Sequence, residues 1–102
     1  MPTGKTTFEW DAIKDRMNRE KHGVSFSKAQ LAFFDENRVI LADTAHSHRE
    51  PRFCCVGKVA DAIMTVRFTY REGVIRIFGA GYWRKGKRIY DKENQLHGRT
   101  NG

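Results

Sequence analysis

The feature that most constrains the fold is a segment in which every second residue is apolar, followed by a turn and another apolar segment. Over residues 62–70 this alternation places one set of side chains on one face of a strand. That set is Met64, Val66, Phe68 and Tyr70. A turn at residues 71–73 follows, in which Gly73 suits a positive φ, and a strand is expected over 74–81. With another strand expected over 52–57, the order predicts an antiparallel meander.

Two helices are expected before these strands. The first covers residues 11–22, where Asp11 can cap the N-terminus and Gly23 follows as a C-terminal stop. The second covers residues 27–34. Its expected capping box is Ser27 with Gln30, inside a hydrophobic staple of Phe26 with Leu31.

Helices followed by strands predict the α+β class. We expect two N-terminal helices packed on an antiparallel sheet of about four strands, with shorter strands at residues 7–10 and 38–43. A short final helix is expected over residues 91–96. The length of 102 residues predicts a single domain, with flexible ends at 1–6 and 97–102.

The charge balance favours a polyanionic partner. The chain has 19 Lys and Arg residues against 12 Asp and Glu residues, which gives a net charge of +7 at pH 7. Such a field attracts nucleic acid, although a basic surface that merely keeps the protein soluble has the same composition. Twelve aromatic residues supply a core, which argues against a disordered chain.

The cysteines and histidines predict neither a metal nor a cofactor. Cys54 and Cys55 are adjacent, so in a strand they point to opposite faces and can hardly pair. His46 and His48 share a loop, but no third ligand accompanies them. No apolar run has the length of a membrane span or the form of a signal peptide. A reduced, cytoplasmic protein without membrane contact is expected.

The strongest local signal is the basic and aromatic segment 82–88. Cations bind phosphate and aromatic rings stack on unpaired bases, so their interleaving is typical of single-stranded RNA binding. A solvated basic turn beside core aromatics is the alternative. The residues expected to bind RNA here are Tyr82, Trp83, Arg84, Lys85, Lys87 and Arg88.

Other candidates are charged residues within or beside strands. Arg67 and Arg76 lie in apolar strands, where an arginine needs a partner or a groove. Glu50 and Arg52 share one face of a strand start, as a base and a phosphate-binding cation would. A solvated sheet face and a surface ion pair are the respective alternatives. His22 ends the first helix, where a cap is commoner than a catalyst.

Several of these residues, in this order, resemble the BrnT family of toxins. The segment 8–11 reads FEWD, and Lys14 and Asn18 lead to KHGVSF at residues 21–26. Further matching positions are Ala29, Phe34, Asp35, Asp43, His46, Glu50, Arg52, Gly57 and residues 76–80. The resemblance spans about residues 8–90. It departs at Gly81, where many family members carry an arginine, and at residues 86–88.

The resemblance implies a fold similar to the RelE-type toxins and an endoribonuclease that blocks translation. It also implies a partner, a BrnA-like ribbon-helix-helix antitoxin, and binding to operator DNA only through the toxin–antitoxin complex. We expect metal-independent cleavage in which the ribose 2′-OH attacks the adjacent phosphorus and the 5′-oxygen leaves. A base, an acid and cations for the developing charge are then required.

The expected catalytic residues are Arg67, Arg76, Trp83, Arg84, Glu50 and Arg52. Arg84 is placed at the scissile phosphate and Trp83 against a base. Lys21 and His22 join Tyr82, Lys85, Lys87 and Arg88 as RNA-binding residues. Two other hypotheses stay open, a non-catalytic module that binds nucleic acid and a domain whose basic groove holds an acidic protein.

Overall fold

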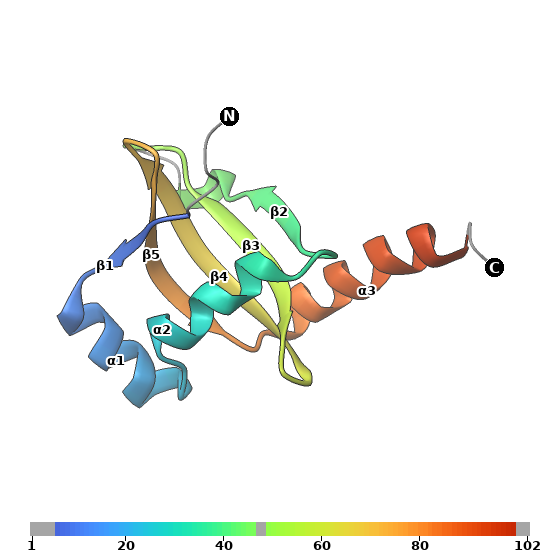
Figure 1. Cartoon of the computed structure of the whole chain (residues 1–102), viewed down its shortest axis with the longest axis horizontal. Helices are drawn as coiled ribbons and strands as arrows, with labels where there is room; N and C mark the ends of the chain where they lie inside the picture. The colour runs from blue at the N-terminus through green and yellow to red at the C-terminus, as the bar shows by residue number, and fades with distance from the viewer. Residues whose placement is uncertain (1–5, 47–48, 100–102) are drawn as a thin grey trace.

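The computed structural model describes residues 6–46 and 49–99, so the ends 1–5 and 100–102 and the loop positions 47–48 lie outside the described residues. Five strands form one sheet in the order β1-β5-β4-β3-β2 (Figure 1). They are β1 (Phe8–Trp10), β2 (Val39–Ala42), β3 (Phe53–Val59), β4 (Ala62–Arg71) and β5 (Val74–Gly81). The α+β class is confirmed, although the sheet has five strands where about four were expected.

The meander of β3, β4 and β5 is confirmed as antiparallel, and β2 pairs antiparallel with β3. Gly73 has the expected positive φ, 81°, in the turn between β4 and β5. The prediction of a purely antiparallel sheet is wrong, because β1 runs parallel to β5, with Phe8 opposite Ile75. Alternation predicts a strand but not its direction relative to β5. That direction depends on the path that the chain takes between the two strands.

The first helix is confirmed as α1 (Ala12–His22). The Asp11 carboxylate accepts hydrogen bonds from the N–H groups of Ile13 and Lys14, at 2.8 and 3.1 Å. Gly23 has φ 70°, and its N–H donates to the carbonyl of Arg19. Local residues alone therefore determine both ends of this helix.

The N-cap of the second helix lies two residues earlier than expected. The helix consists of α2 (Phe26–Ala29) and the 3-10 helix η1 (Gln30–Phe34), and Ser25 rather than Ser27 is the N-cap. The Ser25 hydroxyl accepts from the N–H of Lys28 at 3.0 Å. With Ser25 as the N-cap, Phe26 is the first helical residue and no longer precedes the cap, so the expected staple geometry of Phe26 with Leu31 does not apply. Burial of Phe26 in the first turn accounts for the earlier start.

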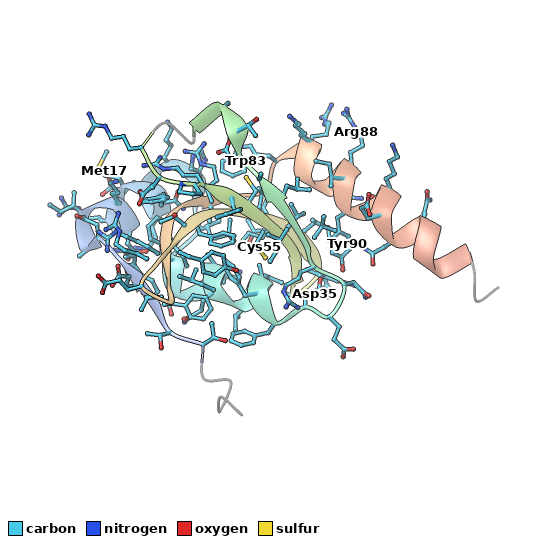
Figure 2. The ribbon with its side chains drawn as sticks, turned by 90° about the horizontal axis from the view of Figure 1, so that it is seen from above. Met17, Asp35, Cys55, Trp83, Arg88 and Tyr90 are labelled. Carbon is cyan, nitrogen blue, oxygen red and sulfur yellow. The ribbon has the colours of Figure 1, made fainter. Side chains whose placement is uncertain are left out.

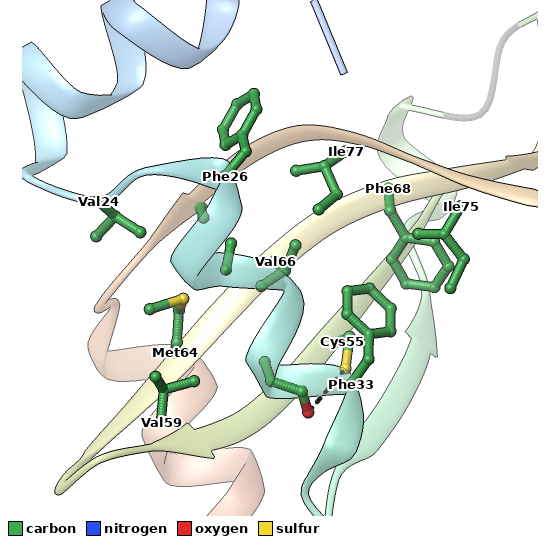
Figure 3. Packing of buried hydrophobic residues seen from close by; sticks show 13 residues of the cluster. Val24, Phe26, Phe33, Cys55, Val59, Met64, Val66, Phe68, Ile75 and Ile77 are labelled. Carbon is green, nitrogen blue, oxygen red and sulfur yellow. Dashed lines mark hydrogen bonds between the residues drawn. The ribbon is translucent and has the colours of Figure 1, made fainter. Parts of the chain in front are cut away.

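The core lies between the sheet and the segment formed by α2 and η1, which covers one face (Figure 3). Gly57 on β3 allows this close packing, because a Cβ there would lie 2.3 Å from the carbonyl oxygen of Ala32. Cys55 is buried in this core, and its thiol donates to the same carbonyl at 3.7 Å. Cys54 is only partly buried. Burial raises the pKa of Cys55 to about 12, so its thiol stays protonated.

The final helix, α3 (Arg84–Arg99), is longer than the expected helix over residues 91–96, because it already begins in the basic segment. Its first turns pack on the sheet face opposite η1, and its later turns extend past the sheet (Figure 1). Gly86 permits this approach, since a Cβ there would lie 2.0 Å from Oγ1 of Thr65. Packing against the sheet therefore overrides the poor helix propensity of glycine.

One polar contact joins α3 to the end of η1. The Tyr90 hydroxyl donates to the Asp35 carboxylate at 2.7 Å, near the N–H donors of Lys58 and Asn37. Burial raises the pKa of Asp35, but these three hydrogen bonds outweigh burial and hold the pKa below its ordinary value. Burial and the Asp35 charge raise the pKa of Tyr90 to about 12.

Candidate nucleic-acid-binding site

A groove of about 450 Å³ lies between α1 and the sheet face formed by β4 and β5. Its lining residues are Lys14, Met17, Asn18, Lys21, His22, Arg67, Phe78, Gly79 and Trp83. Three of them carry a positive charge, and among the described lining residues none is Asp or Glu. We call it the α1 groove.

One face of α1 forms a wall of the α1 groove. Lys14, Asn18 and Lys21 follow one another at intervals of four and three residues, which places them on the same side of a helix. Asn18 is buried and holds this wall in place. Its amide donates to the carbonyl of Ala80 at 3.0 Å and accepts from the N–H of Ala80 at 3.2 Å. The side chain thus pairs with the edge of β5 as a neighbouring strand would.

A β-bulge shapes the floor of the α1 groove. Arg67 on β4 lies opposite Gly79, and the next pair is Phe68 with Ile77, so Phe78 is an extra residue on β5. A Cβ on Gly79 would lie 3.7 Å from Nε of Arg67. The Arg67 guanidinium thus lies beside Gly79, at a distance that would still leave room for a methyl group.

Two aromatic residues stand at the end of α1. The rings of His22 and Trp83 meet edge to face, with centroids 5.3 Å apart. Trp83 packs on Gly81, where a Cβ would lie 2.8 Å from the indole ring. An arginine at position 81 would therefore displace Trp83, so the departure from the BrnT pattern at Gly81 is matched by the position of this tryptophan. In Figure 2, Trp83 lies between α1 and α3 above the sheet.

Phe78 connects the α1 groove to the strand start that carries Arg52. The Arg52 guanidinium lies 4.2 Å from the centroid of the Phe78 ring, and Nζ of Lys14 lies 5.4 Å from it. The carboxylate oxygens of Glu50 lie 3.8 Å from Nη2 of Arg52 and 3.2 Å from Nη2 of Arg71. The Glu50 carboxylate is thus held between two arginines instead of facing the groove.

The other residues of the sequence-based hypothesis lie outside the α1 groove. Arg76 pairs with Glu9 at 2.9 Å, between β5 and β1. Lys87 pairs with Asp91 at 2.7 Å on α3. The remaining exposed residues are Tyr82, Arg84, Lys85 and Arg88. Of the residues expected to act in catalysis or RNA binding, the structure brings Lys21, His22, Arg67 and Trp83 together.

Sequence reasoning missed five residues that line the α1 groove, namely Lys14, Met17, Asn18, Phe78 and Gly79. The spacing of the three on α1 along one helix face, together with Lys21, was a usable signal for them. Nothing local marked Phe78 and Gly79, because the bulge at Phe78 depends on how β5 pairs with β4. The α1 groove therefore lies near the end of α1 and not at the basic segment 84–88.

Among the side chains that the structure describes, no three His, Cys, Asp or Glu residues group as metal ligands do. The pair His46 and His48 expected in the loop is not part of that statement, because the side chains lie outside the described residues. No helix in the described part of the chain is long and apolar enough to cross a membrane.

Comparison with known proteins gives the family. No curated protein matches the chain. The sequence model of one family matches residues 10–86, and its description reads ribonuclease toxin, BrnT, of type II toxin–antitoxin system. The matched segment contains every residue that lines the α1 groove. The chain therefore belongs to the BrnT family, the ribonuclease toxins of type II toxin–antitoxin systems.

Proposed function

We propose that this toxin is a metal-independent endoribonuclease that binds the scissile phosphate of RNA in the α1 groove. One observation carries the proposal. Lys14, Lys21 and Arg67 converge on one concave surface on which no described lining residue is acidic. Such a surface attracts a phosphate backbone and stabilises the charge that develops at phosphorus.

The groove residues match the needs of 2′-OH attack. Arg67, on the floor, stabilises the charge on the pentacoordinate phosphorus, and the two lysines hold the neighbouring backbone. Histidine is the residue type that most readily exchanges a proton near neutral pH, and His22 lies in the lining. We assign His22 to proton transfer and Trp83 to stacking on a base, which positions the 2′-OH for in-line attack.

This assignment moves the centre of the chemistry from Arg84 to Arg67. Arg84 is exposed at the first turn of α3 and does not line the groove. Glu50 is a poor candidate for the base, because its carboxylate is paired with Arg71 and Arg52 and it does not line the groove. Arg52 contributes through its contact with Phe78 at the edge of the groove.

The test is cleavage of a short single-stranded RNA by the purified protein, with and without EDTA. We expect the same rate in both, and 5′ products that end in a 2′,3′-cyclic phosphate. An RNA with a 2′-deoxyribose at the cut position is the matched control and should stay intact there. Loss of activity with EDTA would contradict metal independence, and binding without any cleavage would favour a non-catalytic module.

We also propose that the cleavage inhibits translation in the cytoplasm and that a DNA-binding antitoxin of the BrnA type neutralises it. Membership of a type II toxin–antitoxin family supports an antitoxin partner, and the positive α1 groove suits an acidic segment. Co-expression of the neighbouring gene should relieve growth arrest, and only the complex should shift operator DNA in a gel. The likeness to RelE-type toxins stays a prediction.

A further inference from the structure

We infer that the site holds two adjacent nucleotides of single-stranded RNA, with the phosphate between them on Arg67 and one base in a separate pocket beneath α3. This inference rests on the proposed function and specifies its substrate. The protein would then recognise two adjacent nucleotides together rather than a single nucleotide.

The second pocket, called here the α3 pocket, has a volume of about 470 Å³. This volume falls within the range of pockets that bind small ligands. Its walls include apolar side chains from three elements, namely Leu41 of β2, Val56 of β3 and Ile89 of α3. Apolar walls suit the faces of a nucleobase, and the α1 groove supplies three cations for the backbone.

Two residues belong to both sites. Arg67 and Trp83 line the α1 groove on one side and the α3 pocket on the other. A phosphate bound by Arg67 therefore has one site on each side of it, as the phosphate between two adjacent nucleotides requires. Trp83 offers its ring at the boundary, where it can stack on a base.

An unsatisfied hydroxyl supports a polar ligand in the α3 pocket. Thr65 is about nine-tenths buried and lines the pocket, yet its Oγ1 has no hydrogen-bond partner among the described residues. A buried polar group without a partner is unfavourable, and a ligand that hydrogen-bonds to it removes this penalty. Gly86 packs against this hydroxyl, since a Cβ at position 86 would lie 2.0 Å from Oγ1.

The remaining polar groups suit the edge of a base and a backbone phosphate. Asp43 and Lys85 line the same pocket, which provides an acceptor and a donor. Cys54 also lines it, and burial raises the pKa of its thiol, so this part of the wall stays uncharged. The cations Arg67 and Lys85 favour a nucleotide over an apolar peptide from a protein partner.

The test compares an uncleavable 2′-deoxy dinucleotide with the corresponding 5′-mononucleotide, each titrated into the full-length protein and followed by NMR chemical shifts. We expect the dinucleotide to bind on the order of tenfold more tightly, which is within what stacking one further base contributes. Ile89→Trp fills the α3 pocket and should remove this advantage while mononucleotide binding is kept. Ile13→Trp, at an exposed apolar position outside both sites, is the matched control.

A second variant guards against misfolding of the first. Thr65→Val keeps the shape of the side chain but removes the hydroxyl, and it should lower dinucleotide affinity several-fold with little effect on the mononucleotide. Equal affinity of the wild type for the two ligands, or an unchanged advantage in both variants, would overturn the inference. So would a loss of antitoxin neutralisation in Ile89→Trp with dinucleotide binding intact, because the pocket would then belong to the protein partner.

These measurements do not depend on catalysis. A protein that cleaves RNA but binds both ligands equally contradicts only the two-nucleotide site. A protein that prefers the dinucleotide but never cleaves RNA contradicts only the proposed nuclease function.

Discussion

Two regions of this toxin are rich in cations, but they differ in what the cations surround. On α1, Lys14 and Lys21 face Arg67 across the α1 groove. On α3, Arg84, Lys87 and Arg88 are exposed on the first turns of a helix, and Lys87 already pairs with Asp91. The sequence concentrates charge in the second region, whereas the fold concentrates it in the first. Density of charge along a chain is thus a poor guide to convergence of charge in space.

The largest expected effect is on catalysis at the end of α1. His22→Ala should slow RNA cleavage by about 10²- to 10⁴-fold, because it removes the proposed proton-transfer group. Binding of an uncleavable RNA should change far less. The matched control is Arg16→Ala, an exposed residue of the same helix outside the groove lining. Full activity of a folded His22→Ala protein would place proton transfer elsewhere.

Next in size is the effect of the amide that fixes α1. Asn18→Ala removes the hydrogen bonds to Ala80 and to the carbonyl of Val24, and leaves buried backbone groups unpaired. The free energy of unfolding should fall by about 2–4 kcal/mol. Asn94→Ala on α3, which loses bonds at a more exposed position, should lower it by about 1 kcal/mol or less. Urea unfolding of both variants measures the difference, and equal losses would contradict it.

A pair of glycine substitutions compares the two regions by packing. Gly86→Ala brings a Cβ into Thr65 and should destabilise the protein by about 1–3 kcal/mol through displacement of α3. Gly79→Ala meets Arg67 only at ordinary contact distance, so its effect should stay below about 1 kcal/mol. Thermal unfolding gives both values. The reverse order would mean that the floor of the α1 groove is packed more tightly than the base of α3.

The smallest effect concerns the contact of Asp35 with Tyr90. The folded protein lowers the pKa of Asp35, so the stabilisation is complete above the unfolded pKa and is lost as the pH falls through the folded pKa. Tyr90→Phe removes one hydrogen-bond donor and should reduce stability at pH 7 by about 1 kcal/mol. The variant should also lose less stability than wild type between about pH 5 and pH 3. Parallel pH profiles would contradict this role.

Local signals in the sequence predicted the parts of the fold that depend on neighbouring residues. Asp11 caps the start of α1 and Gly23 ends the helix, as expected, and Gly73 supports the turn before β5. The choice of Ser25 over Ser27 could not be predicted, because it follows from burial of Phe26 against a sheet that forms later in the chain. The parallel pairing of β1 with β5 could not be predicted either, because it joins segments far apart in the chain.

In the candidate site, too, some residues had a signal in the sequence and others did not. Arg67 and Trp83 were identified from residue type alone, as an arginine inside an apolar strand and an aromatic beside basic residues. The expectation for Arg84 came from its place just past the last strand among aromatic residues, but it begins a helix and its side chain is exposed. The ion pair of Arg76 with Glu9 joins residues far apart in the chain and has no local signal. The pair of Arg52 with Glu50 joins near neighbours, and the sequence had offered it as an alternative.

The most direct test of the α1 groove is the cleavage rate of Arg67→Ala beside that of Arg84→Ala, on one RNA at one salt concentration, with circular dichroism to confirm folding. Loss of a cation that stabilises the developing charge should slow Arg67→Ala by roughly 10²-fold or more. Arg84→Ala should lose no more than about threefold, through weaker general attraction of RNA. An Arg67→Ala protein that cleaves at the wild-type rate while Arg84→Ala is inactive would contradict this account and place the chemistry at the start of α3.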